Sequence, residues 1–344
     1  MRSTLPENSL PEDSLPGSTP AGRPADAPTG SPLADTAAHH GHASLSSMVG
    51  IESRRFLKHP LFLIGALLAY ALTWWTVSSD FYETTATQAR PTDLIGTTII
   101  PAFFIGLTSL IVAARLTRST EVSLEAMSTA PGTEARRTLA VAGACFVPLM
   151  AGLIWLVEFI VLVRIRGHYP QELWFGTLPD VDVWATLLAT GVLSCLGGAL
   201  LGVLVGRWLR FPGAPIVSVV ALVAVVMVGQ MWYSYDADVS RFRLYLPWVM
   251  FHPGTFVEPG GYQGIPQYSQ AFLPGNPVFY LFYLLLLCAL AVGGAVWHDR
   301  TVRSARLRWG LAAVVGVTVV VMLLAMLTGN QEMIISDPLP VLPR

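Results

Sequence analysis

The chain has 344 residues, of which 53% are hydrophobic and only 12% are charged, and its mean hydropathy is +0.55. A soluble protein could not keep so much apolar surface from water, so the hydrophobic segments must contact lipid or one another within a bilayer. A formal net charge of −1 gives no basic face of the kind that nucleic-acid binding requires.

The first 44 residues are rich in Pro, Ser, Thr and Gly and have no apolar period, so we expect a disordered cytoplasmic tail. Residues 45–60 place Leu45, Met48, Val49 and Phe56 at helical spacing, close to several cations. This pattern predicts an amphipathic helix on the inner leaflet, ending before Pro60. The alternative is a simple extension of the first membrane span.

The segment 61–328 contains seven apolar runs long enough to cross a bilayer, a length of roughly 20 helical residues. They lie near 61–79, 94–114, 139–163, 184–206, 215–235, 278–297 and 309–328. We therefore predict an all-α fold, a polytopic membrane bundle of six to seven transmembrane helices preceded by the amphipathic interfacial helix. The cysteines, Cys145, Cys195 and Cys288, fall within these runs and are interpreted as small buried apolar residues.

Basic residues orient the bundle. With a cytoplasmic N-terminus, thirteen of the Lys and Arg residues that flank the spans lie inside and six lie outside, as the positive-inside rule requires. We expect a multi-pass protein of the cell membrane with the loop 115–137 in the cytoplasm. The loop 236–276 and the short tail 329–344 would then lie outside.

The loop 115–137 is charged, although it joins two nearly uncharged runs. Its centre is predicted to form a short helix that ends at Pro131-Gly132. Glu121 and Glu125 share one side of this helix, and Leu124 and Met127 form an apolar row. So short a helix is marginal in water, which favours docking on a partner. The alternative, a helix flat on its own membrane, is disfavoured because the glutamates would approach anionic lipid.

Chemistry-bearing residues are scarce within the spans. Glu158 is the one ionisable residue inside them. It could anchor the helix or form a helix–helix hydrogen bond near the outer interface, or it could bind a substrate. We find no nucleophile–base pair, no metal-ligand group and no phosphate-binding loop around Lys58, the sole lysine. We therefore expect no enzymatic activity and no cofactor or metal in this chain; any ATP would be bound by a separate subunit.

A stripe of small residues runs through the fourth span, with Gly198, Gly202 and Gly206 four residues apart. Such a stripe lets a second helix approach closely, either within the bundle or at a dimer interface. The outer loop 236–276 is rich in proline and aromatic residues. It could be a lid or short re-entrant helices, or an aromatic belt at the interface.

The loop and the entry helix together resemble a known family. Arg118, Leu124, Glu125 and Pro131 stand in an order similar to the cytoplasmic loop of ABC-2 type transporter permeases, and the segment IESRRFLKHPLFLIG resembles their amphipathic entry helix. The resemblance covers roughly residues 45 to 300. It implies that the loop is a coupling helix that docks on an ATP-binding subunit, and that the chain pairs with a second permease as a homodimer or heterodimer.

The sequence thus favours the membrane-spanning permease subunit of an ATP-driven ABC-type exporter, coupled through the loop 115–137 to a separate ATP-binding cassette subunit. The alternative is a membrane anchor or an immunity or signalling protein that holds a soluble cytoplasmic partner without transporting anything. A membrane-embedded enzyme is disfavoured because candidate residues are missing.

Overall fold

The protein is a bundle of apolar helices. The computed structural model describes residues 44–78, 97–126, 133–165, 179–231, 241–247, 255–257, 268–270 and 274–329, all within one compact unit, His42–Arg344. Among these residues six helices are long and apolar enough to cross a membrane. The chain is therefore a polytopic, multi-pass helical membrane protein, as the hydropathy pattern predicts. The first 43 residues, including the predicted disordered tail, lie outside the described residues.

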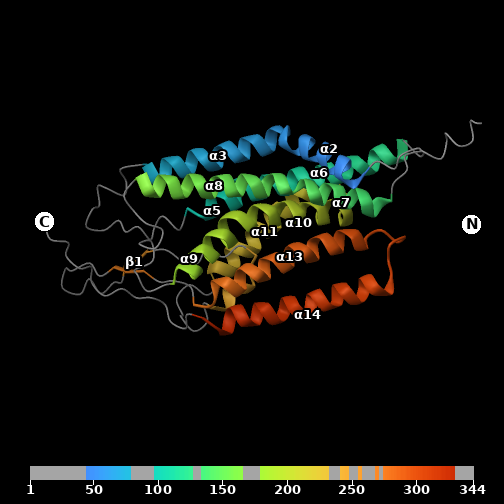
Figure 1. Cartoon of the computed structure of the whole chain (residues 1–344). Helices are drawn as coiled ribbons and strands as arrows, with labels where there is room; N and C mark the ends of the chain where they lie inside the picture. The colour runs from blue at the N-terminus through green and yellow to red at the C-terminus, as the bar shows by residue number, and fades with distance from the viewer. Residues whose placement is uncertain are drawn as a thin grey trace, which may run out of the picture. The chain divides into compact units, whose positions relative to one another are not determined.

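The secondary structure is nearly all helical (Figure 1). The first half contains α2 (Leu45–Leu57), α3 (Pro60–Ser78), α5 (Ile99–Pro101), the π-helical η3 (Ala102–Gly106), α6 (Leu107–Ala126), α7 (Glu134–Ala144) and α8 (Phe146–Ile165). The second half contains α9 (Asp180–Thr186), the π-helical η5 (Leu187–Leu193), α10 (Ser194–Trp208), α11 (Ala214–Met231), the 3₁₀ helix η6 (Arg241–Tyr245), β1 (Thr255–Val257), β2 (Tyr268–Gln270), α13 (Pro277–Trp297) and α14 (Ala305–Leu327).

The six candidate spans are Pro60–Ser78, Ile99–Ser119, Glu134–Ile165, Asp180–Trp208, Pro277–Trp297 and Ala305–Leu327. The remaining predicted run is α11, whose apolar segment Ala214–Gly229 is shorter. The third span differs from the prediction in detail, because a turn at Cys145 divides it into α7 and α8.

Helix α2 is separate from the first span. Lys58 and His59 break the helix, and α3 begins at Pro60, where a missing N–H costs nothing. Helix α2 packs along α7, with Val49 against Gly143. Phe56 is fully buried and meets Phe62 edge-on, with the ring centroids 5.2 Å apart. Of the two alternatives, the structure therefore has a distinct entry helix with one protein-facing side, and Ile51 and Leu57 remain exposed on it.

The centre of the bundle is the contact between α6 and α10. A Cβ added to Gly198, Gly202 or Gly206 would overlap the backbone of Gly106, Leu110 or Ala114, respectively. The small-residue stripe therefore brings two backbones together inside the bundle. On the other side of the core, the Trp155 indole N–H of α8 donates a hydrogen bond to the buried Thr73 hydroxyl of α3 at 2.7 Å.

Helix α14, the last in the chain, packs on α13 and η6 and exposes much of its surface (Figure 1). The 3₁₀ helix η6 is tied to α13, because the hydroxyls of Tyr280 and Tyr283 donate hydrogen bonds to the carbonyls of Leu246 and Tyr245 at 2.8 and 2.7 Å. Of the outer loop 236–276, the structure describes η6, the residues next to it and the antiparallel pair β1–β2, in which Phe256 lies opposite Ser269.

Candidate functional site

The candidate site is the end of the bundle where α2, the extension of α6, the start of α7 and the ends of α10 and α13 meet, which we call the α2 end. Helix α6 does not stop with its membrane span at Ser119 but continues as far as Ala126. Arg118, Glu121, Leu124 and Glu125 therefore lie on one continuous helix. Met127 and Pro131, the other predicted coupling residues, lie outside the described residues.

The chain re-enters the bundle at α7 through a well-capped helix start. The Thr133 side chain accepts a hydrogen bond from the backbone N–H of Arg136 at 3.3 Å, as an N-cap residue does. The next residue, Glu134, points to two partners on distant helices. Its Oε1 lies 3.5 Å from Nη1 of Arg207, which ends α10, and 2.8 Å from Nδ1 of His298, which follows α13.

Arg207 is the best-buried charge of this cluster. Its side chain has no exposed surface, whereas Glu134 retains 30% of its side-chain exposure. A cation without solvent at this depth needs a fixed anion, and removing one partner of such a pair is strongly destabilising. Arg207 and Glu134 therefore hold α10 and the start of α7 in a defined relationship.

Asp299 completes the start of α7. Its Oδ2 accepts a hydrogen bond from the backbone N–H of Ala135 at 3.0 Å, and its Oδ1 accepts from the N–H and the hydroxyl of Thr301 at 2.9 and 2.7 Å. Burial alone would raise the pKa of Asp299, but the hydrogen bonds from Thr301 and Ala135 and the nearby Arg207 charge together lower that pKa below its ordinary value. The carboxylate also complements the positive end of the α7 dipole.

His298 links α7 to the chain beyond α10. Besides Glu134, it contacts Arg210, whose Nη2 lies 3.4 Å from Nε2 of the imidazole. A neutral ring with its proton on Nδ1 satisfies both contacts, because it donates to the carboxylate and accepts from the guanidinium. The indole N–H of Trp208 donates to the Gly294 carbonyl at 2.9 Å, so α10 and α13 are also joined directly.

The other side of the loop is held by α2. Arg55 forms an ion pair with Glu52 at 3.0 Å and donates a second hydrogen bond, at 3.1 Å, to the Ser119 hydroxyl at the point where α6 leaves its span. Both ends of the predicted coupling loop are therefore attached to the bundle by named side-chain contacts: Ser119 to α2, and Glu134 and Ala135 to α10 and to the residues after α13.

Glu158, the predicted intramembrane polar residue, lies on α8, away from this cluster. Its Oε2 is buried and has no hydrogen-bond partner among the residues that the structure describes. Cys145, Cys195 and Cys288 are buried and free, as expected. Within the described ranges no three His, Cys, Asp or Glu side chains are grouped as a metal site requires. The contacts at the α2 end are hydrogen bonds and ion pairs that join helices. The described side chains there include no nucleophile–base pair.

The residues predicted for the site do not include Arg207, His298 or Asp299. In the sequence, Arg207 is one of the arginines that orient the bundle. A local signal existed for Asp299, because an Asp two residues before a Thr commonly accepts hydrogen bonds from that residue in a turn. The partners Glu134 and Ala135 could not be inferred, because they lie 164 residues away from His298 and Asp299 in the chain.

Comparison of this chain with protein-family models, with curated proteins and with solved structures found no match.

Proposed function

We propose that the chain is the membrane-spanning permease subunit of an ATP-driven exporter of the ABC-2 type, and that the loop 115–137 docks on a cytoplasmic ATP-binding subunit. In this proposal the α2 end of the bundle faces the cytoplasm of the cell, the chain lies in the cell membrane, and two permease subunits pair. ATP is bound and hydrolysed by the partner.

The observation that carries the proposal is the attachment of Glu134 to Arg207 and His298. A loop that only joins two spans needs no contact with the rest of the bundle. Here, Glu134, the first residue of α7 in this loop, is held by Arg207 near the end of α10 and by the residue that follows α13. A displacement of the loop by a partner would therefore move α7 against both helices, and contiguous contacts of this kind can carry coupling between distant sites.

The extension of α6 supports the same conclusion. The helix continues beyond Ser119 to Ala126, so the part that carries Glu121, Leu124 and Glu125 is continuous with a membrane span. Because Ser119 is also held by Arg55, the extension is attached where it begins. A partner that binds it would act on a helix that is continuous with the membrane span.

The test is co-purification with an ATPase. We would express the tagged chain together with the protein that carries Walker motifs and is encoded nearest to it, and we would measure the ATPase recovered per permease. Leu124→Arg replaces a predicted apolar anchor with a cation and should abolish recovery, since one central anchor contributes roughly 2 kcal/mol or more to an interface. Ser123→Arg, which adds the same charge on another face of the helix, is the matched control.

Equal recovery of the ATPase with wild type and with Leu124→Arg would show that the loop is not the docking element. A second measurement separates the permease from the non-transporting anchor. If Leu124→Arg abolishes recovery of the ATPase, but the wild-type chain does not change the rate of ATP hydrolysis in proteoliposomes, the anchor is favoured.

A further inference from the structure

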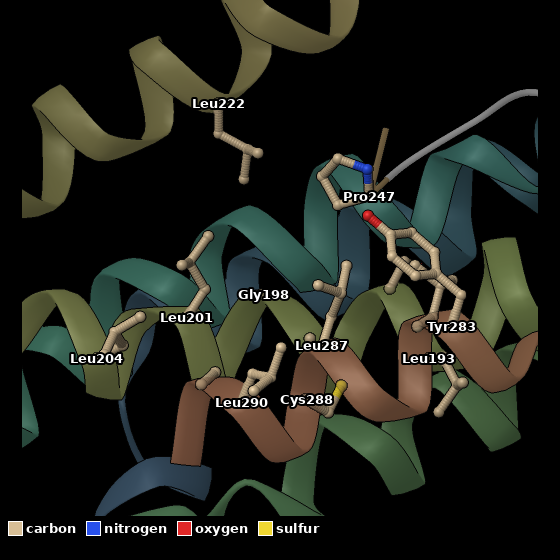
Figure 2. A pocket seen from close by; sticks show the side chains of 14 residues that line it. Leu193, Gly198, Leu201, Leu204, Leu222, Pro247, Tyr283, Leu287, Cys288 and Leu290 are labelled. Atoms are coloured by element: carbon tan, nitrogen blue, oxygen red, sulfur yellow. The ribbon is translucent and has the colours of Figure 1, made fainter. Parts of the chain in front are cut away.

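A cavity of about 450 Å³ lies between α10, α11 and α13. Figure 2 shows Leu222 of α11, Leu201 of α10 and Leu287 of α13 around it, with Tyr283 and Pro247 near one end. Helix α11 packs on α6 and α10, and α13 packs on α10, so the cavity is the space over α10 that the two outer helices leave open.

The chemistry of the lining excludes a polar ligand. None of the described residues that line the cavity is charged, and most are leucine, glycine or alanine. The two hydroxyl groups are already engaged: Ser194 donates to the carbonyl of Thr190 at 2.5 Å, and Tyr283 donates to the carbonyl of Tyr245 at 2.7 Å. A ligand would thus find apolar surface and a thiol, that of Cys288. Such a lining binds hydrocarbon through its burial alone.

The length of the cavity along α10 matches that of a hydrocarbon chain in one leaflet of the bilayer. On α10 the lining runs from Ser194 to Leu204, which at a rise of 1.5 Å per residue is about 15 Å. This length equals about half of the roughly 30 Å hydrocarbon core, which is the depth of one leaflet.

A single aliphatic chain lying along α10 would bury its hydrocarbon against these apolar walls over this whole length. We therefore infer that the cavity between α10, α11 and α13 is a binding site for one acyl chain of a membrane phospholipid. The site requires only that the bundle lies in a bilayer, and it is independent of the proposed transport function.

Photolabelling in nanodiscs tests this site. The purified chain is reconstituted with a phospholipid that carries a diazirine partway along one acyl chain, irradiated, digested and mapped by mass spectrometry. We expect the diazirine lipid to cross-link to the cavity-lining residues of the segments 194–204 and 283–291. Labelling at these positions should be lost with Leu287→Trp, because the larger ring fills the cavity.

The matched control is Leu285→Trp, which places the same ring on an exposed position of the same helix, 42% accessible, outside the lining. It should leave the labelling unchanged. Gly197→Leu is a second filling variant on α10; a Cβ at Gly197 would lie in ordinary contact, 3.7 Å from the Cys288 sulphur, so the first carbon fits without displacing its neighbours. Labelling is compared only between variants that give equal amounts of monodisperse protein. If Leu287→Trp does not assemble, Gly197→Leu takes its place.

Labelling of the two segments that persists at wild-type level in both filling variants would overturn the inference, because it would come from lipid around the bundle. Cross-links from the cavity to another protein chain would also overturn it.

Discussion

Asp299 caps the helix that begins at Glu134: its Oδ2 accepts the backbone N–H of Ala135 at 3.0 Å, from a position 164 residues later in the chain. The start of the third span is thereby held at the α2 end by a residue that follows α13.

Replacing Asp299 with alanine should loosen the start of α7. The change removes a helix cap and the Oδ1 atom that accepts two hydrogen bonds from Thr301, so we expect a loss of about 1–3 kcal/mol in the free energy of unfolding. The measurement is thermal unfolding in detergent together with hydrogen exchange at the Ala135 amide, which should become faster. The exposed neighbour Arg300 changed to alanine serves as the control; if both variants exchange alike, Asp299 does not cap α7.

The pair Glu134 and Arg207 should show energetic coupling. In a double-mutant cycle of Glu134→Gln and Arg207→Met, we expect a coupling free energy of about 0.5–3 kcal/mol, because the two side chains are in contact. The cycle of Glu134→Gln with Arg303→Met is the comparison, since Arg303 is exposed and bonds to the Trp297 carbonyl. If the two substitutions have additive effects on the free energy of unfolding in both cycles, Glu134 and Arg207 do not hold α7 and α10 together.

A single methyl group should disturb the contact between α6 and α10. In Gly202→Ala the new Cβ would overlap the Leu110 carbonyl, which belongs to a backbone that cannot move independently. Overpacking of this kind costs about 1–3 kcal/mol. Gly316→Ala, on α14, adds the same group into open space and should be neutral or slightly stabilising. The readout is the midpoint of thermal unfolding and the monodisperse fraction, and equal values for both variants would contradict the close approach.

The junction between α2 and α3 should depend on pH. The backbone N–H of Leu61 donates to Nδ1 of His59 at 3.3 Å, and burial, with the charge of Arg115, lowers the pKa of His59 below 6.5. The neutral ring therefore stabilises the junction fully above about pH 6.5, and this stabilisation is lost as the pH falls through the folded-state pKa.

Hydrogen exchange at the Leu61 amide should accordingly accelerate between neutral and mildly acidic pH, beyond the intrinsic pH effect on exchange. His59→Asn keeps a side-chain acceptor without a titrating group, so its protection should not show this change. An identical pH profile in wild type and variant would exclude His59 as the cause.

The arginine distribution predicts the orientation of the bundle, and reporters can test this prediction. A reporter that is active only outside the cytoplasmic membrane should be silent when fused after Arg137 and active when fused after Arg344. Activity at Arg137 would reverse the proposed topology, and with it the assignment of the α2 end to the cytoplasm.

Much of the fold could be predicted from the sequence because each span carries its own signal. Length and hydropathy locate α3 or α13 without any knowledge of their neighbours, and Pro60 marks the start of α3. The spacing of Gly198, Gly202 and Gly206 indicates a close helix contact, but not that its partner is α6. The partner depends on which helix the rest of the bundle brings there, and hydropathy does not encode that.

The candidate site was harder to predict for the same reason. In the sequence Arg207 is one of the basic residues that orient the bundle, and nothing there reveals that its side chain is buried against Glu134 at the start of α7. The local pattern predicts a short helix through Glu121 and Leu124, but not that this helix is continuous with the membrane span. The links of Glu134 to His298 and of Ala135 to Asp299 depend on contacts across half of the chain.

The late position of Asp299 also sets an order for biogenesis. Synthesis proceeds at about 5–20 residues per second, so the 164 residues between Ala135 and Asp299 take roughly 10–30 s to appear. During this interval α7 lacks the hydrogen bond to Asp299. Of the two capping side chains, only Thr133 is then present to accept a hydrogen bond from the first turn. The start of α7 is therefore completed only after α13 has been inserted, so that nascent chains that end before Asp299 lack this cap.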